Sequence, residues 1–402
     1  MAAEDEAIPY PFDEPQGLTI HENYAKLQAA EGMCPVKPPY GTTTYLAVKH
    51  ADVRTVLSDP RFSRAKSVGE DEPRVHPFVP RSDALVAMDP PEHTRLRKAL
   101  TGAFTYRRMD ALAPRVQEVV DELLDDLEAA GPPVDLVDKF AQPMSIRVMC
   151  GLLGVPFEDR DKFSGWATAS LSTASSGRTI EEINTARNEM FGYLAALAAR
   201  RAEQPEADLL SVLAHARDEN GTLTQTEMLG LASSVLVAGH ETTANQIGSF
   251  VYVLLSDRRL WNELLESPES VQRAVEELLR VAPVMATAGF SRMATEDVDV
   301  NGHLVRQGER VMPTLFAANA DPTVFPDPLA VDFHRQNIGQ HVAFSYGAHH
   351  CPGNQLARME LQVALRSLLR RFPTLDLAGT PAEVPWRKTV LSRGPERLLV
   401  TW

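Results

Sequence analysis

The most informative segment of this chain reads Phe344-Ser345-Tyr346-Gly347-Ala348-His349-His350-Cys351-Pro352-Gly353-Asn354. Apolar residues recur at roughly helical spacing in the run that follows, Gln355 to Arg371, which predicts a helix with Pro352 as its first residue. Cys351 would then lie at a helix N-terminus, where unpaired N–H groups and the helix dipole favour thiolate over thiol. This placement predicts a metal ligand or a nucleophile. A small buried cysteine is the alternative if Cys351 is taken alone.

Composition limits the classes of protein to which the chain can belong. With 402 residues, 44% of them hydrophobic, it can form one large domain or two to three average ones. The formal net charge of −14 argues against a nucleic-acid partner. There is no run of 18 apolar residues and no signal-peptide pattern, so we expect a cytoplasmic protein without membrane association. Three widely spaced cysteines fit a reducing compartment.

A long buried helix is predicted from about Thr224 to Leu255. Thr224 and Glu227 have the spacing of a capping box, and the middle of the segment is apolar on every side. Gly239, Glu241 and Thr242 lie in that apolar middle, where glycine disfavours helix and a buried carboxylate needs a partner. Residues that break local rules in a core indicate a functional site, with a solvated notch in the helix as the simpler alternative.

Further helices and short strands are predicted along the chain. We expect helices over 21–31, 51–58, 108–131, 137–154, 157–172 and 178–203, with another starting near Met88, and β-rich runs over 41–49 and 284–311. A polar segment, 63–87, reads as a long loop. His93 and Arg97 share a helix face, either as a ligand site or as an exposed basic surface.

The segment quoted first matches the pattern Phe-x-x-Gly-x-His-x-Cys-x-Gly and resembles the haem-binding loop of the cytochrome P450 family, with His where many members have Arg. The resemblance implies a mainly α fold with small β-sheets, in one domain spanning residues 1–402. Haem b would lie between the family's I helix, here the one from Thr224, and the Cys loop with the L helix behind it. Cys351 would be the thiolate ligand of the iron.

Other residues take roles from the same resemblance. The motif His-x-x-x-Arg and a second arginine would bind the haem propionates, and the I-helix motif would leave room for dioxygen and deliver protons. The residues that match the cofactor site are His93, Arg97, Ala238, Gly239, Arg292, Phe344, Gly347, His349 and Gly353. Thr242 would hydrogen-bond the oxygen and Glu241 would help to pass protons inward. These two match the catalytic positions.

One motif departs from the family's pattern. Glu277 and Arg280 match the K-helix pair that braces the loop beneath the haem, and a surface ion pair is the alternative for a Glu-x-x-Arg spacing by itself. Ala330 stands where family members commonly have the arginine that completes this pair. Arg335 is the candidate substitute.

The resemblance predicts a monooxygenase that puts one oxygen atom from O2 into a bulky organic substrate, in natural-product metabolism. A separate ferredoxin or flavodoxin with its reductase would supply electrons to a monomeric enzyme, docking on a basic face whose candidates are Lys98, Arg107, Arg108, Arg358, Arg370 and Arg371. Substrate contacts are expected from 63–87, 163–190, Val235, Ala238, Gly239, 284–288 and 390–392.

Three other functions remain open at this point. The same haem chemistry can serve oxidative coupling or ring formation without oxygen insertion. A non-catalytic haem or metal protein could use His349, His350 and Cys351 as a ligand cluster, although it would not need the acid–alcohol pair at Glu241 and Thr242. A cysteine hydrolase with one of the two histidines as base is the third.

Overall fold

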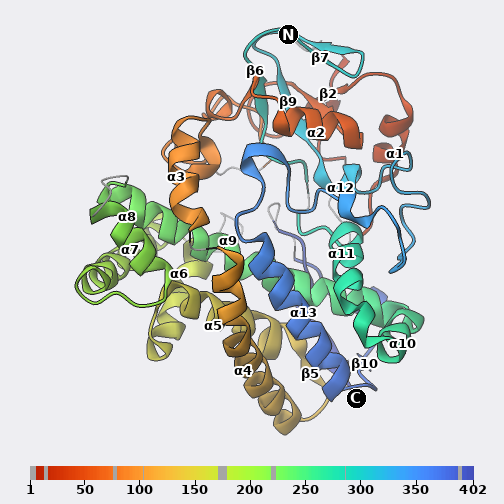
Figure 1. The fold of residues 1–402 in the computed structure, drawn as a ribbon. Helices are drawn as coiled ribbons and strands as arrows, with labels where there is room; N and C mark the ends of the chain where they lie inside the picture. Colours follow the sequence, from red (N-terminus) through yellow and green to blue (C-terminus); the bar gives the residue numbers. More distant parts are fainter. Residues whose placement is uncertain are drawn as a thin grey trace.

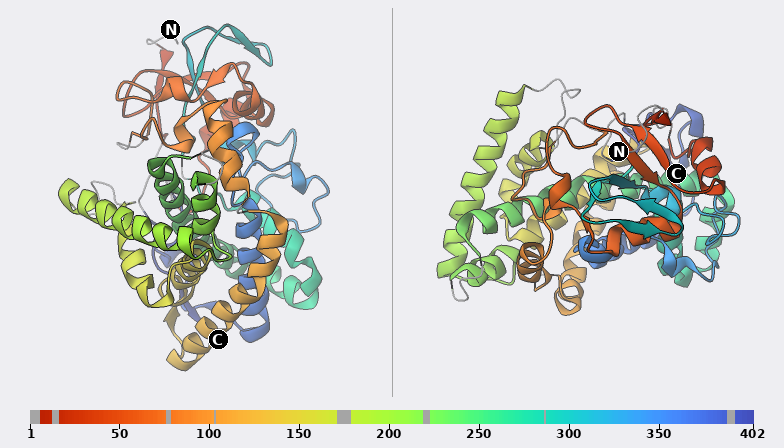
Figure 2. Two further views of the ribbon diagram at one scale, coloured as in Figure 1. Left: turned by 60° about the vertical axis from the view of Figure 1, so that its left-hand side comes forward. Right: turned by 90° about the horizontal axis from the view of Figure 1, so that it is seen from above.

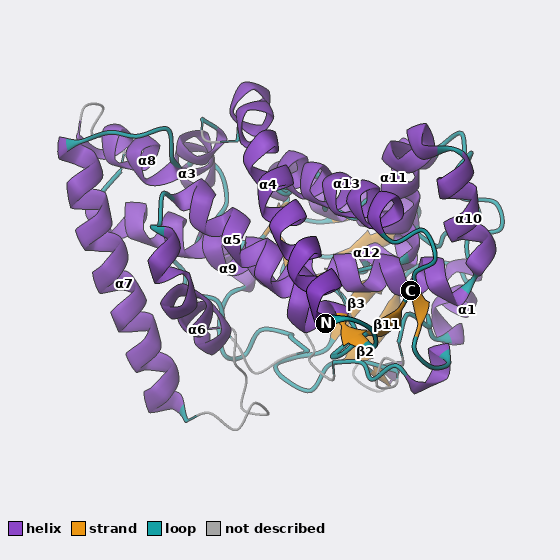
Figure 3. Ribbon diagram, turned by 90° about the horizontal axis from the view of Figure 1, so that it is seen from below, coloured by secondary structure: helices purple, strands orange, loops and turns teal. Residues whose placement is uncertain are grey.

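The computed structural model describes residues 6–12, 17–75, 79–102, 104–170, 179–218, 223–285, 287–387 and 392–402. Helices make up most of these residues, and the strands form small sheets (Figure 3). The largest sheet lies near the N-terminus, and the long helices fill the opposite part of the molecule (Figure 1). This is the mainly α architecture with small β-sheets that the sequence predicts.

The largest sheet combines segments from distant parts of the chain. Its strand order is β1-β2-β3-β9-β6-β4. The strands are β1 (Ile8–Pro9), β2 (Cys34–Lys37), β3 (Thr44–Ala47), β4 (Phe62–Ser63), β6 (Arg292–Ala294) and β9 (Arg310–Pro313). A second sheet joins β5 (Val134–Asp135), β10 (Asp376–Leu377) and β11 (Leu399–Thr401). Strands β7 (Val298–Val300) and β8 (His303–Val305) form a hairpin, and both turn residues, Asn301 and Gly302, have positive φ, as a tight two-residue hairpin turn requires.

The helices occupy most of the predicted ranges. They are α1 (Glu22–Ala29), α2 (His50–Ser58), α3 (Glu92–Thr101), α4 (Tyr106–Ala130), α5 (Gln142–Leu153), α6 (Arg160–Ser170), α7 (Ile180–Glu203), α8 (Leu209–Asp218), α9 (Gln225–Ser256), α10 (Arg258–Glu266), α11 (Val271–Val281), α12 (Leu315–Ala318) and α13 (Asn354–Arg371). Figure 2 shows α7 along one side of the molecule, away from the sheet. None of the helices in the described ranges is long and apolar enough to cross a lipid bilayer.

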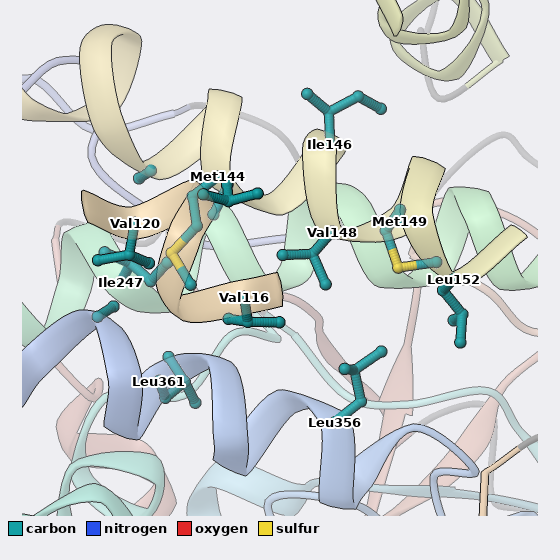
Figure 4. Close-up of a cluster of buried hydrophobic side chains, with 14 of the residues drawn as sticks. Val116, Val120, Met144, Ile146, Val148, Met149, Leu152, Ile247, Leu356 and Leu361 are labelled. Carbon is teal, nitrogen blue, oxygen red and sulfur yellow. The ribbon is translucent and has the colours of Figure 1, made fainter. Parts of the chain in front are cut away.

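Helix α9 is the central helix, and its predicted capping box is present. The Thr224 hydroxyl accepts a hydrogen bond from the N–H of Glu227, whose side chain accepts one from the N–H of Thr224. The helix packs against α5 on one side and α13 on another, and most of its second half is buried. Figure 4 shows side chains of α4, α5, α9 and α13 meeting in this core, among them Val120, Val148, Ile247 and Leu361.

One predicted helix boundary was wrong, and three helices, α8, α10 and α12, were not predicted. Helix α13 begins at Asn354 rather than Pro352, because Pro352 and Gly353 form a turn in which Gly353 is the N-cap residue. Helix α8 was not predicted, although four of its apolar residues are buried at helical spacing: Leu209, Leu210, Leu213 and Ala214.

Candidate functional site

A cavity of about 320 Å³ lies between α9 and the Cys351 loop with α13 behind it. Its wall includes seven of the predicted site residues: Ala238, Gly239, Thr242, Phe344, His349, Cys351 and Gly353. The other predicted residues, His93, Arg97, Glu241, Arg292 and Gly347, are not part of the wall. Apolar side chains from Met149, Leu279, Leu315 and Phe316 complete much of the surface.

The Cys351 loop is held in shape by its own backbone. The N–H of Cys351 donates to the carbonyl oxygen of Phe344 at 2.8 Å, which closes the loop. Gly347 has a φ of 69°, and a Cβ there would lie 2.3 Å from the carbonyl oxygen of Leu57 in α2. Glycine at this position is therefore required by a left-handed turn and a close backbone approach, so its role is to shape the loop.

Burial decides the protonation state of Cys351 in the protein chain alone. It raises the pKa of the thiol, while the N–H of Gly353 and the nearby guanidinium of Arg97 lower it by less. The N–H of Gly353 therefore favours thiolate, as predicted for this end of the helix, but burial outweighs it. A metal ion that binds the sulfur removes the proton, so the ligand role is compatible with a protonated resting thiol.

A cluster of cations and imidazoles lies at one edge of the cavity. Arg292 on β6 is 6% exposed, donates to the carbonyl oxygen of Phe290 at 3.1 Å, and has a pKa lowered to about 9 by burial. Arg97 donates to the carbonyl oxygen of His350. Within the described ranges, neither arginine forms an ion pair with a carboxylate. Buried positive charge of this kind needs an anion.

Two imidazoles belong to the same edge. The rings of His93 and His349 lie 4.3 Å apart between centroids, and burial lowers the pKa of both, that of His349 to about 3. His93 is 2% exposed, and its Nε2 has no hydrogen-bond partner within the described part of the chain. An orphaned donor and two unpaired guanidiniums fit the propionate edge of a haem. Cys351 is in position to be the iron ligand in the same cavity.

Helix α9 presents Ala238, Gly239 and Thr242 to the cavity. The Thr242 hydroxyl donates to the carbonyl oxygen of Ala238 at 2.6 Å, which leaves its lone pairs free to accept. A Cβ at Gly239 would lie 2.5 Å from Sδ of Met149 on α5, so glycine here also allows the two helices to approach. Sequence reasoning assigned this glycine to space for dioxygen and to substrate contact, and did not predict its role in helix packing.

Glu241 points away from the cavity. Its Oε1 accepts a hydrogen bond from the Ser392 hydroxyl at 2.8 Å and lies 3.8 Å from Nη1 of Arg387. Ser392 in turn accepts a hydrogen bond from the Asn245 amide at 3.2 Å. The two proposed catalytic residues, neighbours in sequence, therefore face different surroundings on α9.

Sequence reasoning missed Glu360, a buried acid in the cavity wall. Its side chain is on α13, is 1% exposed and lies beside Thr243 of α9, and its Oε1 has no hydrogen-bond partner within the described residues. Burial raises its pKa to about 8, so the carboxyl is protonated at neutral pH. Glu360 lies four residues after Leu356 and four before Ala364, on the buried stripe of the helix. A charged residue on that stripe was the signal available in the sequence.

The predicted ion pair of α11 is buried and acquires a third member. Nη2 of Arg280 lies 2.6 Å from Oε1 of Glu277, and Nε of Arg335 lies 3.1 Å from the same oxygen. Arg280 also donates to the carbonyl oxygens of Asn319, Pro328 and Ala330. The suggestion that Arg335 replaces the missing arginine at 330 is confirmed, and the alternative of a surface pair is wrong.

The predicted substrate-contact segments contribute unequally. Val235, Val284 and Met285 line the cavity, whereas no described residue of 63–87 or 163–190 does. Residues 286 and 390 lie outside the described ranges, and Ser392 binds Glu241 instead. The described residues contain no group of three or more His, Cys, Asp or Glu arranged to hold a metal ion, which is evidence against the His349–His350–Cys351 cluster.

Comparison with known proteins places the chain among haem-thiolate enzymes. The family model described as Cytochrome P450 matches residues 13–402. Nocardicin C N-oxygenase from Nocardia uniformis subsp. tsuyamanensis is 47% identical over 98% of both chains. Mycinamicin IV hydroxylase/epoxidase from Micromonospora griseorubida is 44% identical, again over 98% of each.

Solved structures agree with these relatives. The LnmA cytochrome P450 hydroxylase from the leinamycin biosynthetic pathway of Streptomyces atroolivaceus superposes with a TM-score of 0.93 at 45% identity, covering 98% of this chain and 100% of that one. A cytochrome P450 with biaryl coupling reactivity superposes with a TM-score of 0.91 at 36% identity, covering 98% and 100%. The fold predicted from the sequence is confirmed.

Proposed function

This chain belongs to the cytochrome P450 family and is an oxidoreductase of the monooxygenase class. On that premise we propose that it inserts one oxygen atom from O2 into a bulky organic substrate, by hydroxylation or epoxidation, in natural-product metabolism. The observation that carries the proposal is the cavity in which Cys351 and Thr242 both form part of the wall. Two of its relatives, at 44% and 47% identity, are named for hydroxylation or epoxidation and for N-oxygenation of natural products.

The chain's residues would hold haem b in that cavity. Cys351 would bind the iron, and the group, when bound, would supply reductive activation of O2. His93, Arg97, Arg292 and His349 would bind the carboxylates at its edge, as the orphaned Nε2 of His93 and the unpaired guanidiniums support. Phe344, Gly347 and Gly353 would shape the loop beneath it.

Protons would reach the cavity through α9. Thr242 would hold a proton at Oγ1 inside the cavity, with its lone pairs oriented by the hydrogen bond to Ala238. Glu241, bound to Ser392 near Arg387, would take protons from outside and pass them inward by rotating away from Ser392. The apolar wall around Val235, Leu279 and Phe316 would exclude other water and limit proton leakage.

We propose that electrons come from a ferredoxin or flavodoxin with its reductase, because the exposed side chains of Lys98 and Arg108 offer positive charge to an acidic donor. A substrate with few charges fits the apolar cavity wall best, and a polyketide, terpenoid or peptide product would meet that condition.

Oxidative coupling is the second candidate, favoured by the 36% identity to a cytochrome P450 with biaryl coupling reactivity. The same site would serve both outcomes. Coupling removes two hydrogen atoms from the substrate, whereas oxygenation adds one oxygen atom to it.

The experiment is a screen of natural products against the purified holoenzyme for the low-spin to high-spin change in its absorption spectrum. Compounds that shift the spectrum are then incubated with a redox system and O2. A product heavier by one oxygen atom, labelled when 18O2 is used, supports oxygenation, whereas a product that has lost two hydrogens and carries no label supports coupling. If the enzyme converts none of the compounds that shift its spectrum, both oxygenation and coupling are contradicted.

A further inference from the structure

A second, smaller cavity of about 20 Å³ lies between residues 64–75, together with Pro80, and the segment that leads into β6. Arg64, Ser67, Arg74 and Phe290 are part of its wall. It is separate from the haem cavity, because its wall shares no residue with the larger one. A volume of about 10–15 Å³ is enough for one water-sized particle, so this cavity holds one atom or one water.

Three buried polar atoms of the wall residues have no hydrogen-bond partner within the described ranges. They are Nε of Arg64, Nε of Arg74 and Oγ of Ser67. Arg64 is 2% exposed and Ser67 is 4% exposed, so bulk water does not satisfy them. The two guanidinium Nε–H groups can only donate, and the hydroxyl can donate as well. The cavity therefore has donors without a matching acceptor.

The same wall carries positive charge that forms no ion pair within the described ranges, although the carboxylates of Asp89 and Glu72 lie close enough to Arg64 to raise its pKa. Burial lowers the pKa of Arg64 to about 10, which leaves it charged at neutral pH. The nearest acid in the wall, Glu72, is bound through both oxygens by Arg310, at 2.7 and 3.0 Å. In the described part of the chain, neither Arg64 nor Arg74 forms an ion pair; their guanidiniums lie over the rings of Phe290 and Tyr40.

An anion satisfies these groups better than a water molecule does. A water molecule brings no charge to offset the guanidiniums, and its own two protons would have to share carbonyl oxygens that already accept hydrogen bonds. Those of Ser67, Gly69 and Glu72 accept from Arg64 or Arg74. Those of Phe290 and Ser291 accept from Arg292. A single-atom anion accepts from every donor and offsets the buried charge.

We propose that this cavity binds a single-atom monovalent anion, chloride under cellular conditions, between Arg64, Ser67 and Arg74. The anion links residues 64–74 to the segment that precedes Arg292 and β6. Binding to the folded chain alone makes thermal stability depend on halide concentration. Polyatomic anions are excluded by the size of the cavity.

Bromide identifies the anion directly. Crystals of the holoenzyme grown in bromide are expected to show an anomalous difference peak within hydrogen-bond distance of Nε of Arg64 and Oγ of Ser67. A water-like peak with no anomalous signal at saturating bromide overturns the proposal.

Thermal denaturation of the holoenzyme tests the same site in solution. Sodium chloride is expected to raise Tm by about 1–3 °C over sodium gluconate at equal ionic strength. Ser67→Ala should reduce this difference and Arg64→Gln should abolish it. Arg81→Gln, which removes an exposed arginine of the same region, should retain it in full.

Two outcomes contradict the anion site. The first is an equal Tm for the wild type in sodium chloride and sodium gluconate, because the folded protein then binds no halide. Loss of haem by Arg64→Gln without any halide effect on the wild type would assign Arg64 to the haem edge instead. Should Arg64→Gln not fold, Ser67→Ala and the bromide crystals still decide the question.

Discussion

Cys351 is the residue on which the proposed chemistry depends, and its surroundings raise the pKa of its thiol. The other two cysteines lie elsewhere, Cys150 in α5 and Cys34 in β2, so neither shares the loop that Phe344 and Gly347 shape.

Cys351→Ala is expected to abolish the spectrum of a thiolate-ligated haem, because the other sulfur atoms that the described residues place in the cavity wall, those of Met149 and Met285, are thioethers. The measurement is the absorption of the reduced, carbon-monoxide-bound protein. Cys34→Ala is the control and should leave the spectrum unchanged. A Cys351→Ala protein with the wild-type band would assign the ligand to another residue.

Thr242→Ala should lower the yield of product per reducing equivalent and raise that of hydrogen peroxide. The reason is that the alanine cannot hold a proton at Oγ1 inside the cavity, while electron entry does not involve this side chain. Thr242→Ser keeps the hydroxyl and should restore most of the coupling. Equal coupling in all three proteins would remove Thr242 from the proton path.

Glu360 makes stability depend on pH. The folded protein keeps its proton up to a pKa of about 8, whereas the unfolded chain releases it near 4.5. Stability therefore falls as pH rises through this window, by at most about 1.4 kcal/mol per pH unit. The side chain of Glu360→Gln stays neutral, so the stability of this variant relative to the wild type should increase as the pH rises from 5 to 8. Tm values measured across that range test this, and a constant difference would show that Glu360 does not titrate there.

At the scale of elements, α11 is tied to the segment before the Cys351 loop by Glu277, Arg280 and Arg335. Both oxygens of Glu277 are used, and the N–H of Asp332 also donates to it. The carboxylate is fully buried, so every one of these donors offsets its desolvation.

Arg335→Gln is expected to destabilise the protein by about 3–5 kcal/mol, because it leaves buried charge on Glu277 only partly compensated. Chemical denaturation followed by circular dichroism gives this free energy of unfolding. Arg366→Gln, an exposed change on α13, is the matched control and should change stability little. A similar small effect of both substitutions would show that Arg280 alone suffices.

At the scale of the whole molecule, the proposed acidic electron donor would need a basic face on this acidic chain. Lys98 and Arg108 are exposed, and Lys98 lies beside Arg97, which contacts the Cys351 loop. Other candidates are already paired: Arg358 binds Glu276, Arg370 binds Asp121, and Arg371 binds Asp125 and Glu128. The side chain of Arg107 lies outside what the structure describes.

Reversal of charge at Lys98 and Arg108 should therefore slow association with a ferredoxin or flavodoxin more than the same change at Arg370. Added salt should lower the wild-type rate, since exposed charges are screened over about 8–10 Å at physiological ionic strength. Stopped-flow reduction kinetics measure both effects. Rates that respond equally to all three positions, or not at all to salt, would place the docking face elsewhere.

The sequence by itself determined the features that depend on short spacings. The loop motif around Cys351, the pair His93 and Arg97 one helical turn apart, and the capped apolar helix through Thr242 all lie within windows of a few turns, so local pattern is enough to predict them. The mainly α architecture was implied by the family resemblance that these motifs carry.

Only the tertiary structure decided how those residues are used. The pKa of Cys351 and that of Glu360 depend on burial by α9 and α13, which meet although more than one hundred residues separate Thr243 from Glu360. The orientation of Glu241 toward Ser392 and the pairing of Arg335 with Glu277 depend likewise on segments far apart in sequence. Desolvation and long-range pairing are properties of the packed chain, so no local spacing encodes them.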